Sequence, residues 1–145
     1  MVAFLAMGPG DGTEIPVAAS RSRRLPRIVR IVAGDGIEVC SRCEVAESTI
    51  ARMRGLLGRD GLGPGEGMLI NPAPSVMTFF MRFSIDVVFV DKAQTIVKIA
   101  HSLAPWRTAG ARGAAAALEL PAGTAAALHL ERGMTLVLAD DVSAQ

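Results

Sequence analysis

Glycine and proline interrupt this chain at short intervals, and that punctuation limits most strongly how it can fold. Of its 145 residues, 15 are glycine and 8 are proline. Segments 34–36, 60–67, 71–74 and 104–113 combine them with other turn-forming residues. Such spacing favours many short strands joined by turns, and it leaves few stretches long enough for a helix.

The segments between these turns carry strand and helix patterns. Residues 27–40 predict a β-hairpin, because β-branched runs flank a turn at Gly34 and Gly36. Residues 44–57 repeat apolar side chains at helical spacing, and Gly58 is a plausible end for that helix. A second, shorter helix is predicted over 124–130, capped by Thr124 and ended by Gly133. Further strands are predicted over residues 68–70, 85–90, 95–99, 118–121 and 134–138.

Taken together, these elements predict a mainly β fold. The regular strand–helix alternation of a parallel sheet is missing, so we expect a compact antiparallel sandwich or jelly-roll-like barrel with one or two short helices. We expect a disordered basic leader over 1–25, a single β-rich domain over 26–140 and a tail over 141–145.

Composition narrows the functional classes. Half of the residues are hydrophobic and 20% are charged, which suits a folded domain with a real core. The net charge of +1 argues against a nucleic-acid binder. No apolar run is long enough for a transmembrane segment, and no convincing signal peptide is present. We therefore expect a cytoplasmic protein.

Cys40 and Cys43 are the only cysteines. A redox pair needs a helix N-terminus directly after the motif to lower the thiol pKa, and a helix near Glu44 could provide it. Two thiols are too few for a structural zinc site, and the two histidines lie far away in sequence. Ordinary cysteines at the end of a strand are the preferred interpretation, and we expect no metal and no cofactor.

Four ordered blocks resemble a known family. They cover residues 54–59, 67–70, 79–91 and 118–123, and the similarity extends from about Arg27 to Leu138. The chain resembles domain-of-unknown-function family 192, also called uncharacterised protein family 0127. The resemblance implies a compact β-rich domain of sandwich or jelly-roll type with small helices packed on it. No enzymatic activity is established for this family, so the resemblance implies none in particular. Many relatives carry an export signal.

The candidate site residues are aromatic and charged. Arg82 and Asp86 are four apart and would share one face of a regular strand, where Arg82 could clamp an anion or form an ion pair with Asp86 or Glu119. Glu119 lies between two leucines and is expected either to face solvent or to pair with an arginine. Candidates for anion binding at the end of the first helix are Arg54 and Arg59. Phe79, Phe80 and Trp106 would form apolar walls.

Three hypotheses follow. The first is a binding or accessory module with a pocket near Arg82 and the 79–83 segment, and a small anionic ligand is the candidate occupant of that pocket. The second is an enzyme of unknown class that uses Arg82, Asp86 and Glu119; no catalytic constellation is recognised, so we lean against it. The third is a protein-interaction module that uses the Trp106 loop and the basic leader. The sequence leaves the oligomeric state open.

Overall fold

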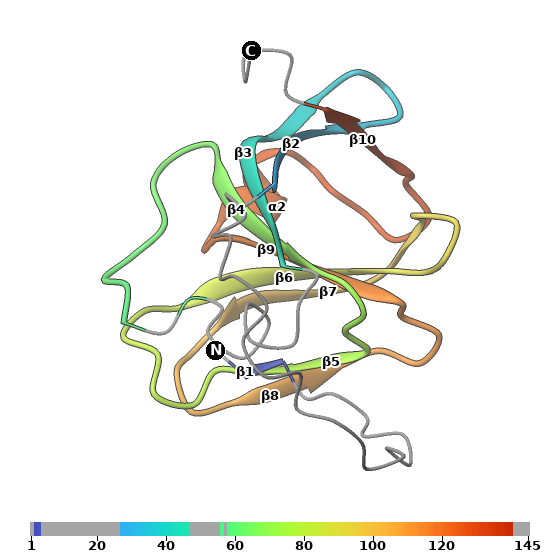
Figure 1. Cartoon of the computed structure of the whole chain (residues 1–145). Coiled ribbons are helices and arrows are strands. Elements are labelled where there is room, and N and C mark those ends of the chain that lie inside the picture. Colours follow the sequence, from blue (N-terminus) through green and yellow to red (C-terminus); the bar gives the residue numbers. More distant parts are fainter. Residues whose placement is uncertain (1, 4–26, 47–55, 57, 141–145) are drawn as a thin grey trace, which may run out of the picture.

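The computed structural model describes residues 2–3, 27–46, 56 and 58–140, which form two β-sheets and one short helix (Figure 1). The longer sheet has seven strands in the order β10-β2-β3-β4-β9-β6-β7, and the smaller has the order β1-β5-β8. The elements are β1 (Val2–Ala3), β2 (Arg27–Ala33), β3 (Glu38–Ala46), β4 (Glu66–Ile70), β5 (Ser75–Met77), β6 (Ile85–Val90), β7 (Ile96–Leu103), β8 (Thr108–Gly110), β9 (Ala116–Pro121), α2 (Thr124–Ala127) and β10 (Leu136–Asp140).

Two hairpins predicted from local sequence are confirmed. Strands β2 and β3 pair antiparallel around the turn at Gly36, whose φ of 94° suits glycine. Strands β6 and β7 also pair antiparallel. The turn between them is held by Asp91, whose Oδ1 accepts backbone N–H bonds from Ala93 (2.9 Å) and Thr95 (3.0 Å).

The mainly β class is confirmed, but the sheet is not wholly antiparallel. Strand β3 pairs parallel with β4, from Arg42 opposite Glu66 to Ala46 opposite Ile70. The helix predicted to start at Glu44 is wrong at its beginning, because residues 44–46 belong to β3. Pairing with both β2 and β4 holds them extended. The rest of that prediction, residues 47–55 and 57, lies outside the described residues.

The long sheet curls into a half-barrel whose two edges meet at one end. A backbone bridge joins Thr95 to Thr135, just before β7 and β10. The neighbouring bonds run from Ile96 N to Met134 O (2.8 Å) and from Leu136 N to Gln94 O (2.9 Å). Gln94 and Leu136, which make this closure, also line a cavity.

Two apolar clusters cover the two faces of the central strands. Inside the curl, residues from β2, β3, β9 and β10 pack with Ala125 of α2. On the outer face, β4, β6 and β9 pack against Val76 of β5, Leu56 and Met81. Both faces of β6 are consequently buried, which explains why all six of its residues are buried although Asp86 carries a charge.

Helix α2 is shorter than predicted and is not capped by Thr124. It spans Thr124–Ala127, its N-cap is Gly123 with φ 91°, and no side chain of the cap residue bonds the helix. The acceptor comes from another element: Oδ2 of Asp86 in β6 receives the N–H of Ala125 at 2.9 Å. A tertiary contact therefore takes the role that local sequence assigned to Thr124.

Candidate functional site

Three aromatic side chains form an exposed cluster, which we call the aromatic tip: Phe79, Phe80 and Trp106. The ring centroids lie 5.7 Å apart for Phe79 and Trp106, and 4.6 Å apart for Phe80 and Trp106. Phe80 is 69% exposed and Trp106 is 54% exposed. The sequence grouped these three residues as the walls of a pocket. Their rings contact one another, with Phe79 partly buried, and the pocket itself stays a prediction.

A buried threonine holds the two segments of the aromatic tip together. The Thr78 hydroxyl donates to Ala104 O at 2.6 Å and accepts from Arg107 N at 2.9 Å. The backbone of Thr78 adds bonds to Arg107 and Trp106, of 2.8 and 3.0 Å. Because Thr78 is fully buried and fully bonded, the aromatic tip stands on a rigid base.

The backbone at the aromatic tip is strained. Phe80 has φ 65° and Trp106 has φ 64°, in the left-handed region that residues with a Cβ rarely adopt. Both residues thus combine an unfavourable backbone with an exposed aromatic ring. Neither feature stabilises the fold by itself, so the arrangement points to a role outside the folded core.

Arg82 lies beside this segment but does not pair as the sequence suggested. It precedes β6, which begins at Ile85, so the strand alternation that was to align it with Asp86 does not apply. Its Nη1 lies 2.8 Å from Oδ1 of Asp60, and both side chains are well exposed. The predicted ion pairs of Arg82 with Asp86 or Glu119 are therefore wrong.

Arg59, the other candidate arginine that the structure describes, does not join Arg82 either. Arg59 pairs with Glu44 of β3, Nη2 to Oε2 at 2.8 Å. Arg54 lies outside the described residues. The anion contacts proposed for these two side chains stay predictions.

Asp86 is a structural acceptor. It is fully buried, and its Oδ1 receives the N–H of Ser102 at 2.8 Å while Oδ2 receives that of Ala125. Its carboxylate therefore ties β7 and α2 to β6. Hydrogen bonds from these two backbone N–H groups offset the free-energy cost of burying the carboxylate.

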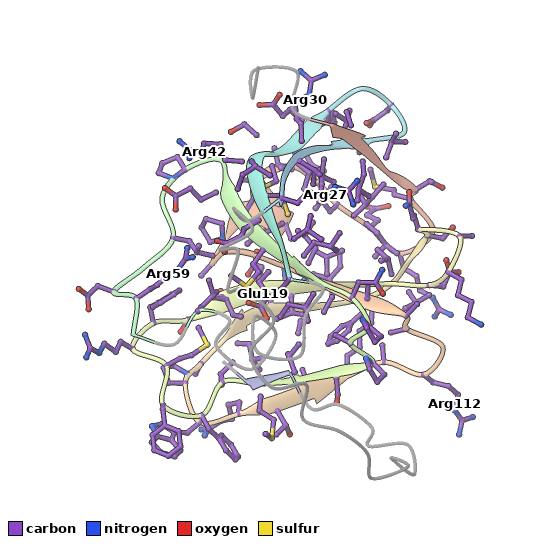
Figure 2. The ribbon with its side chains drawn as sticks, viewed as in Figure 1. Arg27, Arg30, Arg42, Arg59, Arg112 and Glu119 are labelled. Carbon is purple, nitrogen blue, oxygen red and sulfur yellow. The ribbon has the colours of Figure 1, made fainter. Side chains whose placement is uncertain are left out.

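Glu119 is buried among apolar side chains near the middle of the molecule (Figure 2). It is paired in register with Met68 of β4 and Val87 of β6. Neither carboxyl oxygen has a hydrogen-bond partner within the described part of the chain. Burial raises the pKa of Glu119 to about 8, against a smaller lowering by the charge of Arg59. Both alternatives drawn from the sequence, solvent exposure and an arginine pair, are wrong, because the outer face of β9 is covered.

The three residues of the enzyme hypothesis do not converge. Asp86 faces the interior of the curl with Val88, whereas Glu119 lies on the outer face with Val87. The sheet therefore separates the two carboxyl groups, and Arg82 is bonded to Asp60 on the surface.

The cysteines lie inside β3. Cys43 is opposite Val29 and Cys40 opposite Ile31, so a bulge inserts one residue between them and turns both side chains into the core. Both are buried free thiols. Donation of a hydrogen bond from the Cys43 thiol to Cys40, together with burial, raises the pKa of Cys43. The strand continues to Ala46, so the helix N-terminus that a redox pair needs does not follow the motif.

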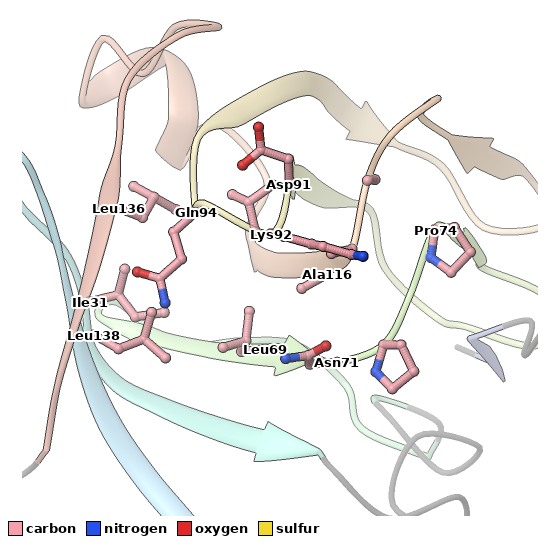
Figure 3. A pocket seen from close by; sticks show the side chains of 14 residues that line it. Ile31, Leu69, Asn71, Pro74, Asp91, Lys92, Gln94, Ala116, Leu136 and Leu138 are labelled. Carbon is pink, nitrogen blue, oxygen red and sulfur yellow. The ribbon is translucent and has the colours of Figure 1, made fainter.

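A cavity of about 580 Å³ opens at the mouth of the half-barrel (Figure 3). We call it the mouth cavity. None of the seven candidate residues that the structure describes lines it. Its apolar walls come from β2, β4, β6, β9 and β10. The residues that these strands place there share no sequence motif that could have identified the cavity. The lining residues are Ile31, Leu69, Asn71, Pro72, Pro74, Val90, Asp91, Lys92, Gln94, Ala114, Ala115, Ala116, Leu136 and Leu138.

Among the described residues, no group of three or more His, Cys, Asp or Glu side chains is placed to hold a metal ion. No described helix is long and apolar enough to cross a membrane.

Comparison with known proteins agrees with this architecture. A solved protein of unknown function from Novosphingobium aromaticivorans has 25% identity and a TM-score of 0.66, covering 76% of this chain and 83% of that one. A solved putative transcription regulator from Sinorhizobium meliloti also has 25% identity, with a TM-score of 0.68, covering 79% and 94%. No curated protein matches the chain. The family model of DUF192, described as "Uncharacterized ACR", matches residues 30–138, and the chain therefore belongs to the DUF192 family.

Proposed function

We propose that this domain is a binding module and that the aromatic tip inserts into an apolar pocket on a partner protein. The observation that carries the proposal is the pairing of exposure with strain at Phe80 and Trp106. Strained residues persist where the surrounding structure holds them, and they cluster at functional sites. Thr78 supplies that support here.

Aromatic side chains that protrude from a rigid base suit protein recognition. Tryptophan, tyrosine and arginine dominate the energetically important residues of interfaces. Burying an aromatic ring of this size removes roughly 150–250 Å² of surface from water. Phe80 is 69% and Trp106 54% exposed, so completing the burial of each ring would contribute roughly 2–4 kcal/mol at about 25 cal/mol per Å², before the costs of association.

The charges beside the aromatic tip favour a partner with an acidic rim. Arg82 and Arg107 are both exposed. The pair of Arg82 with Asp60 is exposed on both sides, and such pairs contribute at most about 1 kcal/mol. A partner carboxylate could therefore take the place of Asp60 at little cost.

A small anionic ligand and an enzyme are less well supported. A small anion would have to displace Asp60 from Arg82 without burying the rings. An active site built from Arg82, Asp86 and Glu119 would need groups that lie on different sides of the sheet. Apart from Val2 and Ala3, the basic leader of the interaction hypothesis lies outside the described residues, so its part in binding stays a prediction.

Photocrosslinking tests the proposal. A photoreactive phenylalanine analogue replaces Phe80 in the cells that naturally make the protein, and a second variant carries it at Ile37, an exposed apolar position in the β2–β3 turn. We expect one discrete protein adduct from the Phe80 position, lost on adding Trp106→Ser, and none from Ile37. Equal labelling from both positions, or adducts that survive Trp106→Ser, would overturn the proposal.

Fluorescence then measures the interaction directly. Trp106 is the only tryptophan and the chain has no tyrosine. Adding the captured protein should shift the Trp106 emission to shorter wavelength, because the indole leaves water. An unchanged emission at saturating partner would place the contact elsewhere on the domain.

A further inference from the structure

The mouth cavity has the size and position of a ligand site. Its volume of about 580 Å³ lies within the range of roughly 300–1,000 Å³ that small-molecule sites occupy. The mouth of a barrel is also one of the places where such sites occur preferentially. Its walls include Ile31, Leu69 and Leu136 from three different strands, so the apolar surface is part of the rigid sheet.

Two polar side chains at the rim of the cavity are available to bind a ligand. Lys92 and Gln94 both line the cavity, and the side chain of neither makes a hydrogen bond or ion pair with another described residue. Figure 3 shows the Gln94 amide directed into the cavity and the Lys92 chain extending across it. Gln94 also has φ 64°, so the turn holds this residue in a strained backbone conformation.

The acidic residue at the rim is already engaged. Oδ1 of Asp91 accepts the backbone N–H groups of Ala93 and Thr95, and Figure 3 shows its carboxyl group directed away from the cavity. Lys92 is therefore the charge that a ligand meets there, with the Gln94 amide as a neighbouring donor.

We propose that the mouth cavity binds an amphipathic monocarboxylate with an aliphatic body. The aliphatic part would contact Ile31, Leu69 and Leu138, and the carboxylate would accept hydrogen bonds from the Lys92 ammonium and the Gln94 amide. One cation and one amide donor match a singly charged head better than a phosphate, which is usually held by several donors. The aromatic tip does not line this cavity, so the inference is independent of the proposed function.

Calorimetric titration with decanoate tests the charge preference, with decanol and decylamine as matched ligands of equal chain length. We expect decanoate to bind at least about tenfold more tightly than either. Lys92→Gln should weaken decanoate about tenfold, as expected for the loss of one charge-assisted hydrogen bond, and should leave decanol unchanged. Lys98→Gln is the matched control, because Lys98 bonds to Gly110 O outside the cavity. It should change decanoate binding less than twofold.

A second variant tests the location without touching the charge. Ala115→Leu adds bulk to the lining and should weaken decanoate more than tenfold while the thermal unfolding transition stays cooperative. Several results would overturn the inference: no decanoate binding to the folded wild-type chain, unchanged binding in a folded Ala115→Leu variant, equal affinity for decanol, or equal effects of the two lysine variants.

Discussion

Replacing Glu119 by glutamine tests whether the buried carboxyl group makes the fold sensitive to pH. The side chain is fully buried, and neither oxygen has a partner among the described residues. Burial raises its pKa from the usual 4.5 to about 8. Glutamine has nearly the same shape but cannot ionise, so the substitution removes the charge and keeps the packing.

The sign and size of the effect follow from these two pKa values. Below pH 4.5 the carboxyl is neutral in both the folded and the unfolded chain, and the stability associated with the raised pKa is fully present. Between pH 4.5 and about 8 the unfolded chain loses the proton while the folded chain keeps it. The free energy of unfolding therefore falls by up to 1.36 kcal/mol per pH unit. Above pH 8 the loss is complete, at about 5 kcal/mol.

Urea denaturation at pH 5 and pH 9 measures this difference. We expect Glu119→Gln to match the wild type at pH 5 and to exceed it by several kcal/mol at pH 9. Glu66→Gln in the adjacent strand β4 is the control, because Glu66 is exposed, and its effect should be small and equal at both pH values. A Glu119→Gln effect that is the same at pH 5 and pH 9 would refute the reasoning.

Three further predictions concern other positions. Gly67→Ala should lower the free energy of unfolding by about 2 kcal/mol or more, because a Cβ there would lie 2.9 Å from both Cys40 Sγ and Glu119 O. Gly61 has open space around it, so Gly61→Ala should change the free energy of unfolding little in the same urea denaturation assay. Asp86→Asn replaces one acceptor oxygen by an NH2 donor that faces a backbone N–H, and it should destabilise the fold by about 2–3 kcal/mol. If calorimetry shows no loss of stability, Asp86 does not anchor β7 and α2 to β6. Phe80→Asn should leave the melting temperature unchanged or raised, since asparagine tolerates positive φ and the ring is exposed; a clear drop would mean that the ring supports the fold.

Local signals accounted for most strands of the long sheet and the turns between them, but they missed β5 and β8 of the smaller sheet. The β2–β3 and β6–β7 hairpins followed from β-branched runs and short turns, and those features act over a few residues. The same kind of reasoning failed at residues 44–46, where helical spacing of apolar side chains was outweighed by pairing with strands on both sides. Hydrophobic periodicity reports which side chains are buried, and it does not report which neighbours a segment finds.

The candidate site residues also depended partly on local sequence and partly on tertiary contacts. Sequence alone determined that Phe79, Phe80 and Trp106 were aromatic residues in turn-rich segments, and it grouped them. Only the tertiary structure decided that Thr78 would join the two segments and that the rings would stay exposed. It likewise decided that Asp86 would cap a helix 39 residues away and that Glu119 would lie on a covered face.

The mouth cavity is the feature of the fold that could least be predicted from the sequence. The chain determines its short strands, its turns and its mainly β class, because those depend on contacts between near neighbours. The cavity depends on how far a seven-stranded sheet curls and where Thr95 meets Thr135. Its lining residues are scattered from Ile31 to Leu138, and only long-range strand pairing brings them to one surface.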